Sequence, residues 1–142
     1  MKEKGFTFIE ILVVVTIIAT LTAIGTVSYI QVGKQARDAK RKDDLQTLQK
    51  EFEMYYQINS SYPVGSTPDA CYDSLVASIA TAKHPKDPDT DLDYVWDCSV
   101  AQAYCICTNS LEILTKGNAS DTACTFADNE AYYCVKNRQT LN

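Results

Sequence analysis

Residues 4–15 read KGFTFIEILVVV, and they begin the stretch that decides the fold of this 142-residue chain. A short charged leader, residues 1–5, is followed at Phe6 by an apolar run that lasts to Ile30. As a helix, residues 6–30 would span about 37 Å, enough to cross a hydrocarbon core of roughly 30 Å. The sequence therefore predicts a membrane-length helix at the amino terminus.

A single charge, Glu10, lies inside the apolar run. Because a carboxylate at the bilayer centre costs about 2.5 to 3.5 kcal/mol, its presence indicates a function. The small residue Gly5 precedes the apolar run, whereas a secretory signal peptide carries its small-residue cleavage site after a shorter apolar core. This order predicts that the leader is removed on the cytoplasmic side and that the helix remains in the mature protein.

The run from Lys4 to Val15 resembles the class III leader and helix start of type IV pilins and the related pseudopilins. In that superfamily a prepilin peptidase cuts after the glycine, here Gly5, and methylates the new amino terminus, here Phe6. The resemblance implies that Glu10 pairs with the terminal amine of a neighbouring subunit during assembly. Opposite charges attract strongly in a filament core of low dielectric constant, and neither is tolerable there alone.

Apolar side chains recur at steps of three and four beyond the membrane-length run, at Leu45, Leu48, Phe52 and Tyr55. This spacing predicts a helical face packed on a globular domain. Turn-forming residues at 59–61 come after this face and shortly before Pro63, so we expect the helix to end at about Ile58. The predicted organisation is a leader (1–5), a long helix (6–58, with 6–30 in the membrane or filament core) and a globular head (59–142).

Many members of the superfamily carry a proline in the apolar helix, but this chain has none before Pro63. If the helix partly unwinds on assembly, Gly25 is the obvious place, because glycine weakens a helix by about 1 kcal/mol relative to alanine. Small residues in this run also permit close helix approach.

Charged residues between Lys34 and Asp44 follow the apolar run. A basic cluster beside a membrane span ordinarily indicates a cytoplasmic location, which conflicts with an exported head. We give priority to the leader, where Lys2 and Lys4 keep the start of the chain on the cytoplasmic side of the membrane. The cluster is then interpreted as a solvated helix face, with contact to lipid headgroups or a partner subunit as the alternative.

The head is predicted to be α+β, with the long helix packed on a small antiparallel sheet of about three strands. Strand-like runs, rich in aromatic and β-branched residues, cover 92–97, 103–109 and 131–136, and a short helix is expected over 75–82. Residues 55–63 and, more loosely, 85–136 resemble the heads of G-type pseudopilins of type II secretion. The expected architecture is therefore the pilin fold.

All six cysteines lie in the head, which indicates disulfide bonds formed in an oxidising compartment. A hairpin turning at residues 101–102 would place Cys98 opposite Cys105. Cys124 could then close a loop with Cys134, which leaves Cys71 for Cys107. Alternatively, Cys105 and Cys107, on one strand face, could join Cys98 and His84 around zinc.

Two acidic sets in the head could hold calcium, although both are better explained as solvated loop charge. Neither set has a complete EF-hand pattern, and no other cofactor is expected. The first set is Asp87, Asp89 and Asp91, and the second is Asp121, Asp128 and Glu130.

Composition excludes several functions for the head. Residues 59–142 carry five Lys or Arg against eleven Asp or Glu, so we expect the isolated head to bind no nucleic acid. The chain has one histidine, His84, and lacks a phosphate-binding glycine loop and a nucleophile elbow. We therefore expect no enzyme, and the only enzymatic rival is a thiol enzyme based on Cys105 and Cys107.

The resemblance implies a structural subunit of a type IV pilus-like filament, polymerised through its apolar helix. Its expected partners are copies of itself, the prepilin peptidase, an inner-membrane assembly platform with its ATPase, and minor pilins. The precursor would be a single-pass membrane protein, and the product a cell-surface or extracellular filament. The alternatives are a pseudopilin of a type II secretion system and a membrane-anchored binding module that never polymerises.

Overall fold

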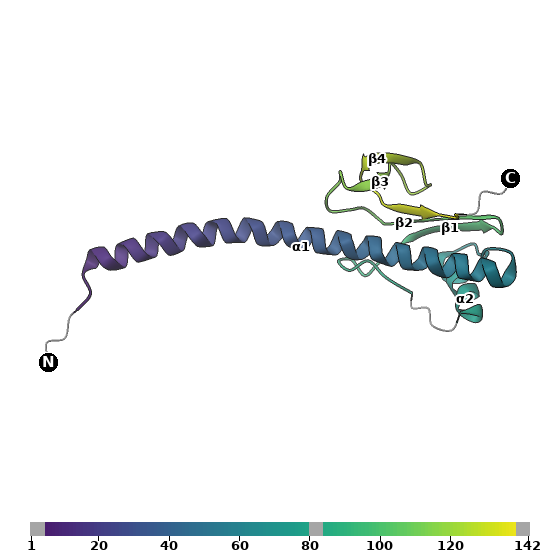
Figure 1. Ribbon diagram of the computed structural model, residues 1–142, viewed down its shortest axis with the longest axis horizontal. Coiled ribbons are helices and arrows are strands. Elements are labelled where there is room, and N and C mark those ends of the chain that lie inside the picture. The colour runs from purple at the N-terminus through teal and green to yellow at the C-terminus, as the bar shows by residue number, and fades with distance from the viewer. Residues whose placement is uncertain (1–4, 80–83, 139–142) are drawn as a thin grey trace. The chain divides into compact units, whose positions relative to one another are not determined.

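Helix α1 (Phe8–Asn59) begins two residues beyond the predicted membrane-length start and continues one residue beyond the expected end at Ile58. The computed structural model describes residues 5–79 and 84–138, drawn in colour in Figure 1. Two compact units are distinguished, Met1–Lys34 and Gln35–Asn142, and each is described by itself. The second part of α1 thus belongs to the same unit as the head.

In the first unit, the apolar side chains of α1 that the structure describes are exposed on every side. Within the described part of the chain, α1 is the helix that is long and apolar enough to cross a membrane. The hydroxyls of its threonines donate to carbonyls of the preceding turn, as Thr16 Oγ1 does to the Val13 carbonyl at 2.8 Å. Such bonds satisfy the hydroxyls inside the helix, as an apolar surrounding requires.

The second unit adds a short helix and two small antiparallel sheets to the remainder of α1. Strands β1, β2 and β5 form one sheet in that order, and β3 pairs with β4 in the other. The elements are α2 (Pro68–Ser78), β1 (Val95–Val100), β2 (Ala103–Cys107), β3 (Gly117–Ala119), β4 (Phe126–Glu130) and β5 (Cys134–Lys136). The α+β class, with a long helix on a three-stranded antiparallel sheet, is confirmed (Figure 1).

The core of the second unit lies between α1 and the three-stranded sheet. Leu45, Leu48 and Phe52 are completely buried, which confirms the apolar stripe of the helix as the packing face. The Phe52 ring meets the Tyr104 ring at 4.5 Å and the Trp96 ring edge-on at 5.8 Å, between ring centroids. Aromatic pairs of this kind add about 0.5 to 1.5 kcal/mol each beyond their buried area.

Several element bounds differ from those expected. Helix α2 begins at Pro68 because Thr67 caps it, its hydroxyl accepting the Ala70 N–H at 3.2 Å, and it ends at Ser78. The expected helix over 75–82 was therefore placed too late, and residues 80–82 lie outside the described residues. Strand β3 was missed because it is only three residues long, and strand β4 was missed because it carries exposed polar residues.

Gly117 is required where β3 approaches its neighbours. A Cβ atom at this position would collide with the carbonyl oxygens of Glu130 and Tyr132. Only glycine therefore permits this strand pairing, which holds the second sheet beside the disulfide-bonded part of the head.

Candidate functional site

The start of α1 forms a capping box from Thr7 and Glu10. The Thr7 backbone N–H and hydroxyl both donate to Glu10 Oε2 at 2.8 Å, and the Glu10 N–H donates to Thr7 Oγ1 at 3.4 Å. A threonine followed three residues later by glutamate gives this reciprocal bonding at a helix start. The other carboxylate oxygen, Oε1, has no hydrogen-bond partner among the described residues, so it is available to an external donor.

Residues at the predicted processing site are accessible. Phe6 is 83% exposed, and a Cβ atom built on Gly5 would meet nothing within 4 Å. The predicted cleavage after Gly5 would leave the new amine of Phe6 next to Thr7 and four residues before Glu10. Cleavage and methylation at this bond stay predictions.

Gly25 lies within the uninterrupted helix α1, and a side chain there would meet no other atom within 4 Å. The helix is therefore continuous at the residue that we named as the place for unwinding. Whether it unwinds in a filament stays a prediction.

Three of the charged residues after Lys34 are buried in the head, so the interpretation as a solvated helix face was wrong for Asp38, Arg41 and Asp44. Arg41 is 3% exposed and donates to both carboxylate oxygens of Asp87, from Nε at 2.7 Å and from Nη2 at 3.0 Å. Its Nη1 donates to Asp38 Oδ1 at 2.8 Å. Arg37 forms a two-pronged ion pair with Glu112, including Nη2 to Oε2 at 2.7 Å.

Asp38 connects this network to the backbone of the head. Its two oxygens accept the N–H groups of Glu112 and Ile113, each at 2.9 Å. Buried charges are tolerated only where they are paired and hydrogen-bonded in this way. We call Asp38, Arg41 and Asp87 the buried ionic cluster, and it ties α1 to two loops of the head.

The buried ionic cluster also changes proton affinities. Burial alone would raise the pKa of Asp87, but the bonds from Arg41 and from the Asp89 and Thr90 N–H groups lower it to about 2. The pKa of Arg41 is raised, chiefly by its hydrogen bonds to Asp87. Both groups therefore stay charged over the physiological pH range.

Disulfide bonds join Cys71 to Cys98, Cys105 to Cys124 and Cys107 to Cys134, with Cα atoms 6.5, 6.0 and 4.1 Å apart. The presence of three bridges was expected, but the expected pairs Cys98–Cys105, Cys124–Cys134 and Cys71–Cys107 were wrong.

A bulge in the hairpin explains the error. Near the turn, Val100 lies opposite Ala103, and this register, if continued, would set Cys98 opposite Cys105. The register instead shifts after Val100, so that Asp97 lies opposite Cys105. A one-residue shift moves a side chain to the other face of the sheet, and Cys98 therefore points towards α2 and Cys71.

The expected zinc set is not brought together, because Cys98 is bonded to Cys71. His84 stacks on Tyr72, with ring centroids 4.6 Å apart, and packs edge-on against Trp96. These contacts place the histidine between α2 and β1.

The two acidic sets are also not gathered into metal clusters among the residues that the structure describes. The Asp87 carboxylate is occupied by Arg41, and Asp121 Oδ1 accepts the N–H groups of Ala123 and Thr125 at 2.9 and 3.1 Å. Calcium binding at either set stays a prediction from the sequence.

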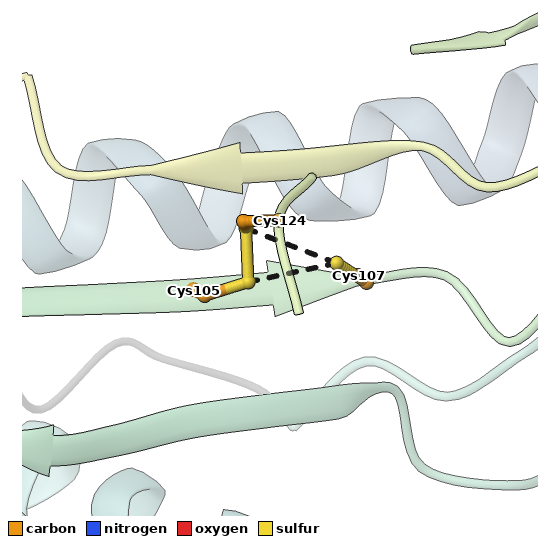
Figure 2. Close-up of side chains that lie close together, drawn as sticks. All are labelled: Cys105, Cys107 and Cys124. Atoms are coloured by element: carbon orange, nitrogen blue, oxygen red, sulfur yellow. Dashed lines mark hydrogen bonds between the residues drawn. A yellow bond between two sulfur atoms is a disulfide. The ribbon is translucent and has the colours of Figure 1, made fainter. Parts of the chain in front are cut away.

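Three cysteine sulfurs do form a cluster. Cys105, Cys107 and Cys124 have their Sγ atoms within 4.8 Å of one another. Figure 2 shows the bridge from Cys105 to Cys124 beside Cys107. The sequence indicated a shared face for Cys105 and Cys107, but nothing in it revealed the approach of Cys124, which comes from a loop.

Comparisons with known proteins found a matching family model and a curated relative. A family model described as the prokaryotic N-terminal methylation motif matches residues 1–26. The chain is 28% identical over 86 residues to the type II secretion system core protein G of Dickeya chrysanthemi, covering 61% of this chain and 54% of that protein. It thus matches about half the length of this curated relative. No solved structure matches.

The methylation motif and the similarity to a type II secretion core protein support the resemblance to the type IV pilin and pseudopilin superfamily that is seen in the sequence. The motif and the apolar helix fit a membrane-anchored precursor.

Proposed function

We propose that this chain is a structural subunit that polymerises through the apolar part of α1 into a type IV pilus-like filament. The observation that carries the proposal is an apolar helix exposed on every side, with one carboxylate at its start. So much apolar surface requires a partner, first lipid and then neighbouring copies of the same helix.

Glu10 has the geometry for assembly. Its Oε2 caps its own helix through Thr7, and its Oε1 is free to accept a hydrogen bond from the Phe6 amine of an adjacent subunit after cleavage at Gly5. The pair would neutralise two charges that the apolar core cannot hold singly. The partners follow from this function: a prepilin peptidase, an assembly platform with its ATPase, and minor pilins.

A pseudopilin of a type II secretion system is the second candidate, favoured by the similarity to the secretion protein of Dickeya chrysanthemi. Both candidates are structural and non-enzymatic, and both place the head outside the cytoplasmic membrane. They differ in their product, a long surface filament or a short one that serves secretion.

Deletion of the chain from its host separates the two candidates. For a pilus subunit we expect loss of sheared surface filaments in electron micrographs with secretion of exported proteins unchanged. Loss of secretion with normal surface filaments would instead support the pseudopilin.

Substitution Glu10→Gln tests polymerisation itself, because glutamine keeps the shape and the helix cap but removes the charge. We expect filaments to be lost while the precursor is still made and inserted. The matched control is Asp73→Asn, which removes one exposed head carboxylate and should leave filaments unchanged. Normal filaments that contain the Glu10→Gln chain would contradict a role of the charge in polymerisation, and filaments that lack the chain altogether would favour the membrane-anchored module that never polymerises.

A further inference from the structure

A shallow hollow of about 360 Å³ lies on the head between α1 and the turn that precedes β3. The turn is closed by the Lys116 N–H, which donates to the Ile113 carbonyl at 3.0 Å. The whole hollow belongs to the second unit. Its lining residues are Gln35, Asp38, Ala39, Lys42, Ile113 and Lys116.

Two lysines give this hollow a positive charge. Lys116 is exposed, and Lys42 Nζ donates to the Lys116 carbonyl at 2.5 Å, which uses one of its three N–H donors. Among the described lining residues the only carboxylate is Asp38, which is 4% exposed. Its oxygens already accept bonds from Arg41 and from two backbone N–H groups. The hollow therefore suits an anion with oxygen acceptors, such as a phosphate group.

An exposed leucine lies beside the two lysines. Leu114 is 59% exposed and belongs to the same turn as Ile113 and Lys116. A surface that joins basic and apolar side chains binds at the boundary between water and an anionic bilayer, because it gains from both kinds of contact. A soluble phosphate ion would gain from the lysines only. The leucine therefore favours a lipid headgroup over a free anion.

The connection along the chain keeps the hollow near a bilayer. Gln35 follows the end of the apolar run, Ile30, by five residues. Five residues span about 7.5 Å as a helix and at most about 18 Å when fully extended, so this limit holds for any arrangement of the two units. Headgroups extend about 5 to 7 Å beyond each side of the hydrocarbon core. The remaining distance is comparable with the roughly 8 Å over which charges act at physiological ionic strength.

We propose that the hollow binds the phosphate group of an anionic phospholipid through Lys42 and Lys116, with Leu114 in contact with the bilayer surface. The inference rests on anchoring of the chain by its apolar helix and is independent of polymerisation. The contact orients the head on the membrane before the chain joins any assembly. Asp43, the acidic neighbour of Lys42 in the sequence, lines a different hollow and does not oppose the anion there.

The test places a reporter beside the hollow. The full chain with Leu114→Trp is reconstituted in vesicles of phosphatidylcholine alone, or of equal parts phosphatidylcholine and phosphatidylglycerol, and the signal of the parent's Trp96 is subtracted. We expect a shift of emission to shorter wavelength, and stronger quenching by lipids with nitroxide headgroups, in the anionic vesicles. The matched control is Val100→Trp, which is half-exposed beside the β1–β2 turn and should respond equally in both vesicles.

Three outcomes of this experiment would overturn the proposal. The first is an equal response of Leu114→Trp in neutral and anionic vesicles. The second is the same response when inorganic phosphate is added to neutral vesicles, which would indicate a site for a free anion. The third is a response that rises with the number of chains per vesicle and ignores the lipid, which would indicate contact between copies.

Lysine variants localise the site in the Leu114→Trp chain. Lys116→Gln keeps the backbone carbonyl to which Lys42 donates, and we expect it to lower the ratio of docked to undocked heads about fivefold. That factor corresponds to about 1 kcal/mol for one basic residue near an anionic surface. Addition of Lys42→Gln should abolish the difference between the two vesicles. The matched control is Lys50→Gln, an exposed lysine of α1 outside the hollow, which should dock as the parent does. Parent-like docking by Lys116→Gln and by the double variant would overturn the assignment.

Discussion

The two parts of helix α1 differ in what surrounds them. From Phe8 to Lys34 the described apolar side chains are exposed and the threonine hydroxyls bond to the helix itself, so these side chains have no packing partner among the described residues of the first unit. From Gln35 to Asn59 one face is completely buried against the sheet, and charged residues pair with loops of the head. One helix therefore has an apolar surface that is exposed within the first unit and, further along, a face that is part of the core of the head.

The buried ionic cluster gives the largest expected effect on the second part. Arg41→Ala leaves Asp38 and Asp87 without their main partner, and removal of one member of a buried ion pair costs about 3 to 5 kcal/mol. We expect that loss in the free energy of unfolding of the head, measured by chemical denaturation of the full chain in detergent. The control is Lys86→Ala, whose exposed pair with Asp93 should contribute less than about 1 kcal/mol. Equal losses in the two variants would contradict the role of the cluster.

The second-largest expected loss of head stability comes from the buried apolar face of α1 between Gln35 and Asn59. A matched control is available in the exposed part of the same helix. Leu48 is completely buried, so Leu48→Ala should lower the free energy of unfolding of the head by about 2 to 5 kcal/mol. Leu12→Ala makes the same chemical change in the first part and should leave head stability unchanged. Circular dichroism and tryptophan fluorescence, through Trp96, follow the unfolding of the head. A loss of similar size with Leu12→Ala would show that the two parts do not divide the roles as described.

Acid should loosen the head through Asp87. Its pKa is about 2 when folded and ordinarily about 3.9 when unfolded, so ionised Asp87 contributes stability that is complete above about pH 4. That contribution, about 2 to 3 kcal/mol, is lost as the pH falls from about 4 towards 2. Unfolding free energies of the parent and of Asp87→Asn, measured over this range, should converge at low pH. A constant difference between the two chains would contradict this assignment.

Gly25→Ala makes the smallest change and tests the first part alone. A methyl group there meets no other atom, and alanine favours a helix by about 1 kcal/mol over glycine. If the helix stays continuous in the filament, sheared filaments should be recovered in normal or greater yield. Reduced yield with normal precursor levels would indicate that α1 must unwind at Gly25 during assembly.

Much of the fold could be predicted from the sequence because its signals are local. Gly5, Phe6 and Glu10 stand close together in the chain, and the spacing of Leu45, Leu48 and Phe52 reports one helix face directly. The three-stranded sheet followed from clusters of aromatic and β-branched residues. The capping box was also readable from Thr7 and Glu10, although we assigned the glutamate only to assembly.

The remaining features depend on tertiary structure. The pairing of Arg41 with Asp87 joins residues 46 positions apart, and no local pattern connects them. The disulfide pairs depended on a single bulge between Asp97 and Val100, since one residue of register decides which face Cys98 occupies. The approach of Cys124 to Cys107 arises from a loop whose course has no periodic signal.

The central claim is that the charge of Glu10 serves assembly and leaves the fold of the head unaffected. The most direct measurement is a filament reconstruction that resolves the cleaved amino terminus. We predict the Phe6 amine of one subunit within hydrogen-bond distance, about 2.7 to 3.0 Å, of Glu10 Oε1 in its neighbour. Glu10 bonded only to its own Thr7, with the neighbouring amine elsewhere, would contradict the account.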